Sequence, residues 1–160
     1  MKYFAYGSNM SENNLKSRDV IYSKRQKGIL KGYKFIINKK SYKDPTIGFA
    51  NIIIDENSFV EGVLYDVKET EILKLDKFEG FPKHYYKSKV YVDIGGFFEE
   101  AIVYIAQTEW TSITELKTTE EYRNKILEGK DSISDEYFQF LNENIKVENG
   151  NWNYKYKFYN

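Results

Sequence analysis

Apolar and polar residues alternate along several segments of the chain, which is the pattern of half-buried β-strands. Residues 2–6 are predicted to form a first strand, and the apolar, β-branched runs over residues 49–54 and 59–67 predict two more. The segment between the last two, residues 55–58, has the sequence DENS, which is rich in turn-forming residues. We therefore predict that these two strands form a β-hairpin.

Glycine residues mark two further places in the strand pattern. Residues 85–94 and 97–106 flank a Gly-Gly dipeptide, which is typical of tight hairpin turns. Over residues 20–38 the alternation is imperfect and is interrupted by two glycines. This region is therefore predicted to form strands that bend or carry a bulge.

Other segments are predicted to be helical, and residues with a known capping role mark their ends. Ser11 is the expected N-cap of a short helix that continues to residue 16. Gly80 and Pro82 end a helix predicted over residues 69–79. Two further helices, each preceded by a capping residue, are predicted over residues 119–127 and 135–143.

This order of elements predicts the α+β fold class, dominated by antiparallel strands that are numerous enough to curl into a partly closed barrel. Residues 152–159 alternate aromatic with polar side chains and are predicted to add an edge strand. No internal repeat or low-complexity linker divides the chain. We expect one domain over residues 1–160.

Charge and composition exclude several classes of function. The 160 residues include 24 basic and 24 acidic side chains, so no net field attracts nucleic acid or an anionic membrane. There is no cysteine and only one histidine, which excludes disulfides, thiolate nucleophiles and a three-histidine zinc site. No apolar stretch is long enough for a membrane-spanning helix. We therefore expect a cytoplasmic protein with a small or neutral partner.

The first predicted strand runs into Gly7-Ser8-Asn9, three residues that a strand does not need. Glycine allows backbone conformations that other residues avoid, and a loop that opens a helix can direct N–H groups at an anion or a developing oxyanion. The alternative is an ordinary strand-to-helix turn, in which Ser8 and Asn9 bond their own backbone. The loop lacks the residues of a P-loop or a nucleophile elbow.

Glu79 is predicted to point towards the protein interior from the end of its helix. Its side chain lies close to the centre of the helix's apolar face. That face consists of Ile72, Leu73, Leu75 and Phe78. Burial and the helix macrodipole should both raise the pKa of Glu79. The alternative is a structural carboxylate that reaches water or pairs with a lysine such as Lys83.

Three motifs, by their order and spacing, resemble the gamma-glutamylcyclotransferase family, in its AIG2-like and gamma-glutamylamine cyclotransferase-like form. They are YFAYGSN over residues 3–9, VEGVLYDV over residues 60–67, and LDKFEG over residues 75–80, which is followed by Tyr85 or Tyr86. The similarity extends over about residues 2–130. It includes EEYRNKILEGKD, which is similar to a later helix of the family that carries a tyrosine.

The resemblance implies a small mixed, mainly antiparallel β-barrel with flanking helices, and an enzyme that uses no cofactor or metal. The family converts a small gamma-glutamyl substrate to 5-oxoproline and a free amino acid or amine. The resemblance implies that Glu79 is the catalytic acid–base. The substrate-binding residues that it implies are Tyr3, Phe4, Ala5, Tyr6, Gly7, Ser8, Asn9 and Tyr122. A C-terminal extension from about residue 134 has no counterpart in the family, so its role stays open.

Other functions stay open on residue types alone. A non-catalytic small-ligand or partner-binding module of the same fold would use the aromatic residues for recognition, and the basic stretch over residues 24–43 could contact RNA. A serine hydrolase would use Ser8 with His84. Within the helix over residues 69–79, Asp76 is a weaker acid–base candidate than Glu79. The motifs describe only the glutamyl end of a substrate, so the leaving group and the oligomeric state are not predicted.

Overall fold

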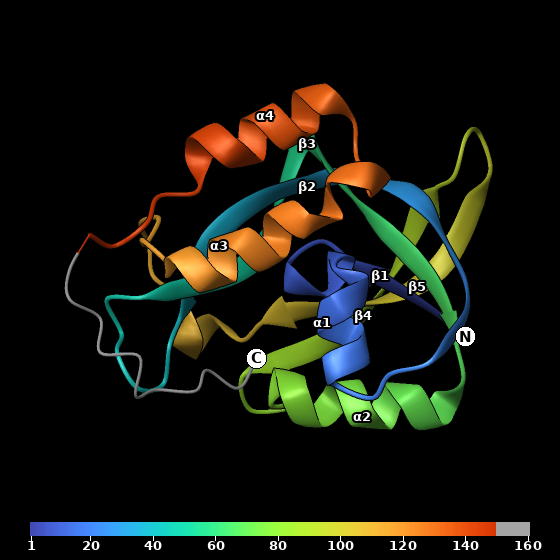
Figure 1. Cartoon of the computed structure of the whole chain (residues 1–160), viewed down its shortest axis with the longest axis horizontal. Coiled ribbons are helices and arrows are strands. Elements are labelled where there is room, and N and C mark those ends of the chain that lie inside the picture. Colours follow the sequence, from blue (N-terminus) through green and yellow to red (C-terminus); the bar gives the residue numbers. More distant parts are fainter. Residues whose placement is uncertain (150–160) are drawn as a thin grey trace.

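The computed structural model describes residues 1–149, in which helices pack around a closed β-barrel (Figure 1). The elements are β1 (Lys2–Ala5), η1 (Ser8–Met10), α1 (Glu12–Ser17), β2 (Tyr22–Lys40), β3 (Gly48–Val67), α2 (Glu69–Glu79), β4 (Tyr85–Asp93), β5 (Phe98–Ala106), η2 (Thr108–Trp110), α3 (Glu120–Leu127), η3 (Glu128–Ser132) and α4 (Asp135–Asn144). The edge strand predicted over residues 152–159 lies outside the described residues.

Five strands close the barrel in the order β1-β3-β2-β4-β5. Neighbouring strands are antiparallel except β1 and β5, which run parallel and meet at Tyr3 and Ile102. In Figure 1, α3 and α4 lie together on one side of the molecule and α2 lies on the opposite side. The predicted fold class, a mixed and mainly antiparallel barrel with flanking helices, is confirmed.

The hairpin predicted between residues 49–54 and 59–67 is wrong, because β3 continues through residues 55–58 without reversing its direction. Both halves of β3 pair with the same strand, β2. The pairs nearest the interruption are Tyr33 with Ile54 and Lys31 with Phe59.

The turn-forming residues of β3 instead form a local bulge opposite Gly32 of β2. Asp55 accepts hydrogen bonds from Asn57 N at 3.1 Å and from Ser58 Oγ at 2.8 Å, as in a turn. Gly32 has a φ of +84°, a left-handed conformation that glycine adopts at little cost. The irregularity predicted for the segment that became β2 is therefore confirmed, and its partner strand follows the same bend.

A pair of glycines brings β1 close to the long strands. Gly28 of β2 lies directly opposite Gly62 of β3, and the fully buried ring of Phe4 packs over both. A Cβ at Gly62 would overlap the carbonyl oxygen of Ala5 and lie 2.8 Å from Phe4 Cζ. Because neither glycine has a side chain, β1 can close the barrel and deliver the following loop to a fixed place.

The predicted helix ends match the structure closely. Ser11 accepts a hydrogen bond from Asn14 N at the start of α1, and Thr119 and Ser134 cap α3 and α4 in the same way. Gly80 ends α2 with a left-handed φ of +63°. The predicted hairpin of β4 and β5 is confirmed, with positive φ at both glycines of its turn.

The helix that follows residue 134 is part of the core. α4 contributes Tyr137 and Leu141 to the buried cluster, and Ile145 follows in the same cluster. In the described part of the chain, no helix has the length and apolar composition needed to cross a membrane.

We predict that Gly62→Ala destabilises the fold through steric overlap with β1. The added methyl group should cost about 3 kcal/mol, as overpacking of a core can. Gly95→Ala is the control, because its Cβ would meet no atom within 4 Å and only its φ of +90° is unfavourable, at about 1 kcal/mol. Urea denaturation measures both. Equal losses in the two variants would contradict the steric role of Gly62.

Candidate active site

The loop after β1 forms the single 3₁₀ turn η1. Met10 N donates a hydrogen bond to Gly7 O at 3.0 Å, so the N–H groups of Ser8 and Asn9 have no partner within the turn. Gly7 has a φ of −118° and a ψ of −136°, a combination outside the helical and extended regions. Close packing also favours glycine here, because a Cβ would lie 3.0 Å from Ala50 Cβ.

Asn9 fastens this loop to Glu79. Its Nδ2 donates to Glu79 Oε1 at 3.2 Å and to the Tyr3 hydroxyl at 2.9 Å. Its Oδ1 accepts a hydrogen bond from Asn14 Nδ2 at 2.9 Å, and its backbone oxygen accepts one from the Tyr65 hydroxyl at 2.9 Å. The loop and Glu79 are therefore adjacent, as expected if they share one site.

Glu79 is the last residue of α2, and its side chain is 13% exposed. Its Oε1 lies 3.4 Å from Arg18 Nη1, and the Arg18 side chain is itself 5% exposed. The pairing with Lys83 that the sequence left open is not formed, since the Lys83 ammonium lies over the rings of Tyr42 and Trp110. Burial raises the pKa of Glu79, and the charges of Arg18 and Lys39 only partly oppose this effect.

One narrow stripe of α2 faces the barrel. It contains Ile72, Leu75 and Glu79, which are three and four residues apart. Leu73 is 58% exposed, so its predicted place on the buried face is wrong. Asp76 lies on the inward side of α2 instead. It accepts hydrogen bonds from the Tyr104 hydroxyl at 2.6 Å and from Lys87 Nζ at 2.8 Å. Both Asp76 oxygens are thus committed to structural partners.

Glu79 and the loop line one small cavity of about 30 Å³. Its walls are Tyr3, Phe4, Tyr6, Gly7, Ser8, Asn9, Ala50, Glu79, Tyr85, Tyr104 and Tyr122. Of the residues that the sequence singled out for the site, only Ala5 is not in this wall. Ala5 is buried, but its methyl group is much shorter than the Tyr3 side chain that reaches the cavity from the same strand.

Five tyrosines in this wall surround the Glu79 carboxylate. Burial raises the pKa of each of them, in the case of Tyr122 to about 12, and the negative charge of Glu79 acts in the same direction. Their hydroxyls therefore stay protonated at neutral pH. The Tyr122 hydroxyl accepts a hydrogen bond from Ala50 N at 3.1 Å, which fixes it beside Gly7.

Two cations near Glu79 were not identified from the sequence. Arg18 could have been found, because it follows the buried Asn14 and Leu15 of α1 at helical spacing and so lies on the same inward face. Lys39 is 2% exposed although it lies in a run of polar residues, and nothing in its local sequence indicates this burial.

The serine hydrolase alternative lacks support from the geometry. Ser8 lines the Glu79 cavity, whereas His84 is not among the lining residues. His84 Nδ1 instead lies 3.1 Å from Lys39 Nζ. Among residues 1–149, no group of three or more His, Cys, Asp or Glu side chains is arranged to hold a metal ion.

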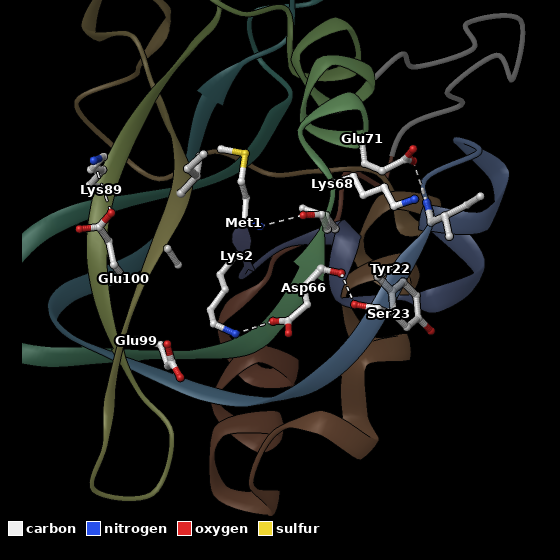
Figure 2. A pocket seen from close by; sticks show the side chains of 14 residues that line it. Met1, Lys2, Tyr22, Ser23, Asp66, Lys68, Glu71, Lys89, Glu99 and Glu100 are labelled. Carbon is white, nitrogen blue, oxygen red and sulfur yellow. Dashed lines mark hydrogen bonds and ion pairs between the residues drawn. The ribbon is translucent and has the colours of Figure 1, made fainter.

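A larger cavity of about 720 Å³ lies elsewhere, around the start of β1 (Figure 2). None of the catalytic or substrate-binding residues expected from the sequence lines it. Three of its acidic side chains have basic partners: Asp66 pairs with Lys2 at 2.6 Å, Glu71 with Lys74 at 3.2 Å and Glu100 with Lys89 at 3.4 Å. The smaller cavity, which combines unpaired backbone donors with a perturbed carboxylate, is the better candidate for chemistry.

Residues 3–130 match the family described as gamma-glutamyl cyclotransferase, AIG2-like. The chain belongs to this family. The match contains every residue described above as lining the Glu79 cavity and ends before α4. A search of curated proteins finds no match.

Solved structures of similar proteins share the cyclotransferase fold. A gamma-glutamyl cyclotransferase is 21% identical with a TM-score of 0.79, over 94% of this chain and 90% of that one. YkqA from Bacillus subtilis is 23% identical with a TM-score of 0.81, over 92% of this chain and 56% of that one. A yeast cyclotransferase specific to glutathione is 15% identical with a TM-score of 0.62, over 91% and 95%. At these identities the likeness establishes the fold.

We predict that the difference in unfolding free energy between the wild type and Glu79→Gln falls as the pH rises. The folded-state pKa of Glu79 is raised above its unfolded value, so its stabilising contribution is present at low pH. It is lost as the pH rises through the folded-state pKa. Urea denaturation of both proteins between about pH 4 and pH 8 measures this difference. A difference that increases with pH would mean that the pairing with Arg18 and Asn9 outweighs burial.

Proposed function

We propose that this protein is a cofactor-independent gamma-glutamylcyclotransferase that releases 5-oxoproline from a gamma-glutamyl substrate. The observation that carries the proposal is a buried carboxylate with a raised pKa, Glu79, held 3.2 Å from the Asn9 side chain of a loop with unpaired N–H groups. The AIG2-like family membership supports the same reaction.

In this reaction Glu79 acts first as a base. It takes a proton from the substrate α-ammonium, whose nitrogen then attacks the γ-carbonyl carbon and closes the five-membered ring. A carboxylate with a raised pKa suits this step, because its proton affinity is closer to that of an amine. Arg18 and Asn9 hold the carboxylate in one orientation during the transfer.

The ring closure places negative charge on the former carbonyl oxygen. The N–H groups of Ser8 and Asn9 are the donors that stabilise this oxyanion, or alternatively the α-carboxylate of the substrate. Glu79, now protonated, gives its proton to the departing amine as the carbon–nitrogen bond breaks. The new ring nitrogen then loses its second proton to the Glu79 carboxylate, which passes it to the released amine, so that 5-oxoproline and an ammonium ion are formed. Atoms and charges balance within the substrate and Glu79, so no step requires a metal or a cofactor.

The tyrosines complete the site by recognition rather than by proton transfer. Their protonated hydroxyls can donate hydrogen bonds to substrate oxygens, while their rings keep water from the reacting atoms. The cavity of about 30 Å³ holds a water molecule or two, so its walls must open to admit a glutamyl group. Of the substrate-binding residues proposed, Tyr122 comes from the element most distant in sequence from the loop.

We predict that Glu79→Gln removes 5-oxoproline release by at least the roughly 10²–10⁴-fold that acid–base groups contribute. The substitution keeps the side-chain shape, so substrate binding should largely survive. Glu69→Gln is the matched control, because Glu69 is an exposed glutamate at the other end of the same helix. Mass spectrometry of the products decides between functions: free glutamate indicates hydrolysis, and no product indicates a non-catalytic binding module.

We also predict that Arg18→Met shifts the acid limb of the pH–kcat/KM profile to higher pH. Arg18 lowers the pKa of Glu79, so its removal raises that pKa further, and the ionised base is then present only at higher pH. Arg18→Lys keeps the charge and should restore much of the original profile. An unshifted limb in Arg18→Met would show that Arg18 has only a structural role.

A further inference from the structure

A cluster of basic and aromatic side chains lies beside the Glu79 cavity. It comprises Lys39, Tyr42, Lys83, His84 and Trp110, and we call it the Trp110 cluster. Lys39 Nζ and Lys83 Nζ lie 5.2 and 5.9 Å from the centre of the Trp110 ring system. The rings of His84 and Tyr42 lie 4.3 and 6.0 Å from it.

Three donors in this cluster lack a negatively charged acceptor. Within residues 1–149, neither Lys39 nor Lys83 has a carboxylate at ion-pair distance. The indole N–H of Trp110 is buried and has no hydrogen-bond partner in the same part of the chain. Ammonium and indole groups only donate hydrogen bonds, and a buried donor left unpaired is costly. Lys83 is exposed, whereas Lys39 and the indole N–H are buried, so the buried donors are the ones that an anion bound at this cluster would satisfy.

His84 is not a charged partner for these donors. Burial and the neighbouring charges of Lys39 and Lys83 lower its pKa to about 4, so its ring is neutral at pH 7. Its Nδ1 accepts the hydrogen bond from Lys39, which leaves the ring proton on Nε2. Burial lowers the pKa of Lys39 to about 8, so its side chain is still mostly charged at neutral pH.

The Trp110 cluster adjoins the active site through Tyr85 and Gly80. Tyr85 lines the Glu79 cavity, and its ring centre lies 5.7 Å from Lys39 Nζ. The His84 ring packs on Gly80, the residue after Glu79, where a Cβ would lie 2.7 Å from His84 Cδ2. Tyr42 and Trp110 of the cluster also line a cavity of about 200 Å³, whose other walls are Lys40, Ser41, Pro45 and Glu109.

We propose that the Trp110 cluster binds a carboxylate of the leaving group, so that the preferred substrates release an amino acid or a short peptide rather than a simple amine. This proposal rests on the proposed cyclotransferase function. The cluster packs against Tyr85 of the Glu79 cavity and against Gly80, and its donors match a carboxylate. Glu109 is the one acidic residue in the adjoining wall; it is exposed and should weaken this attraction.

The test uses two substrates that differ only by that carboxylate, gamma-glutamylglycine and gamma-glutamylmethylamine. We expect the wild type to prefer the glycine compound by about tenfold in kcat/KM, as one charge-assisted hydrogen bond supplies. Lys83→Met and Trp110→Phe should each reduce this preference several-fold and leave the rate on the methylamine compound nearly unchanged. Glu109→Gln should increase it. Lys77→Met, an exposed lysine of α2, is the control that should change neither rate.

The result that overturns the proposal is equal use of the two substrates by the wild type, or an unchanged preference in both Lys83→Met and Trp110→Phe. If neither substrate yields 5-oxoproline, the proposed function fails instead. The carboxylate site is then judged by calorimetric titration with the same two compounds. Tighter binding of the glycine compound, lost in both variants, would support it, and equal affinities would refute it.

Discussion

The burial of one carboxylate is the constraint on which the site depends. Glu79 ends α2 with its side chain turned towards the barrel, and a charge in that position is tolerated only if protein groups replace the water it has lost. Arg18 and Asn9 supply this replacement from two other elements, at 3.4 and 3.2 Å. Because Arg18 and Asn9 compensate for burial only in part, the pKa of Glu79 stays raised. The burial that makes the charged carboxylate unfavourable therefore also makes it a stronger base.

Barrel closure determines where these partners lie. The glycine pair Gly28 and Gly62 leaves room for Phe4, which fixes β1 between β3 and β5. The loop that follows β1 then packs against Ala50 and the end of α2. Asn9 is held there by four hydrogen bonds, which involve Tyr3, Asn14, Tyr65 and Glu79. The loop and the Glu79 carboxylate are therefore held in place before any substrate arrives, as electrostatic catalysis requires.

Two turn signals in the sequence had different outcomes. Gly95-Gly96 reverses the chain, because both residues adopt positive φ and the flanking strands then pair with each other. Residues 55–58 also make turn-like hydrogen bonds, yet the strands on either side pair with β2 and not with each other. A local signal specifies a local bend. Whether the chain reverses depends on which partner strand offers a continuous ladder, and β2 is long enough to offer one throughout.

The sequence by itself determined the helix ends and the inward direction of Glu79, because caps and helical periodicity act within a few residues. The order of its motifs also determined the family and the loop that would accompany Glu79. Only the tertiary structure decided that Arg18 would be the partner of Glu79 and that Lys39 would be buried among aromatic rings. Each of these contacts joins elements far apart in the chain, Arg18 with Glu79 across 61 positions and Lys39 with His84 across 45. No local pattern encodes such distances, since they follow from how the barrel closes and which side chains it then encloses.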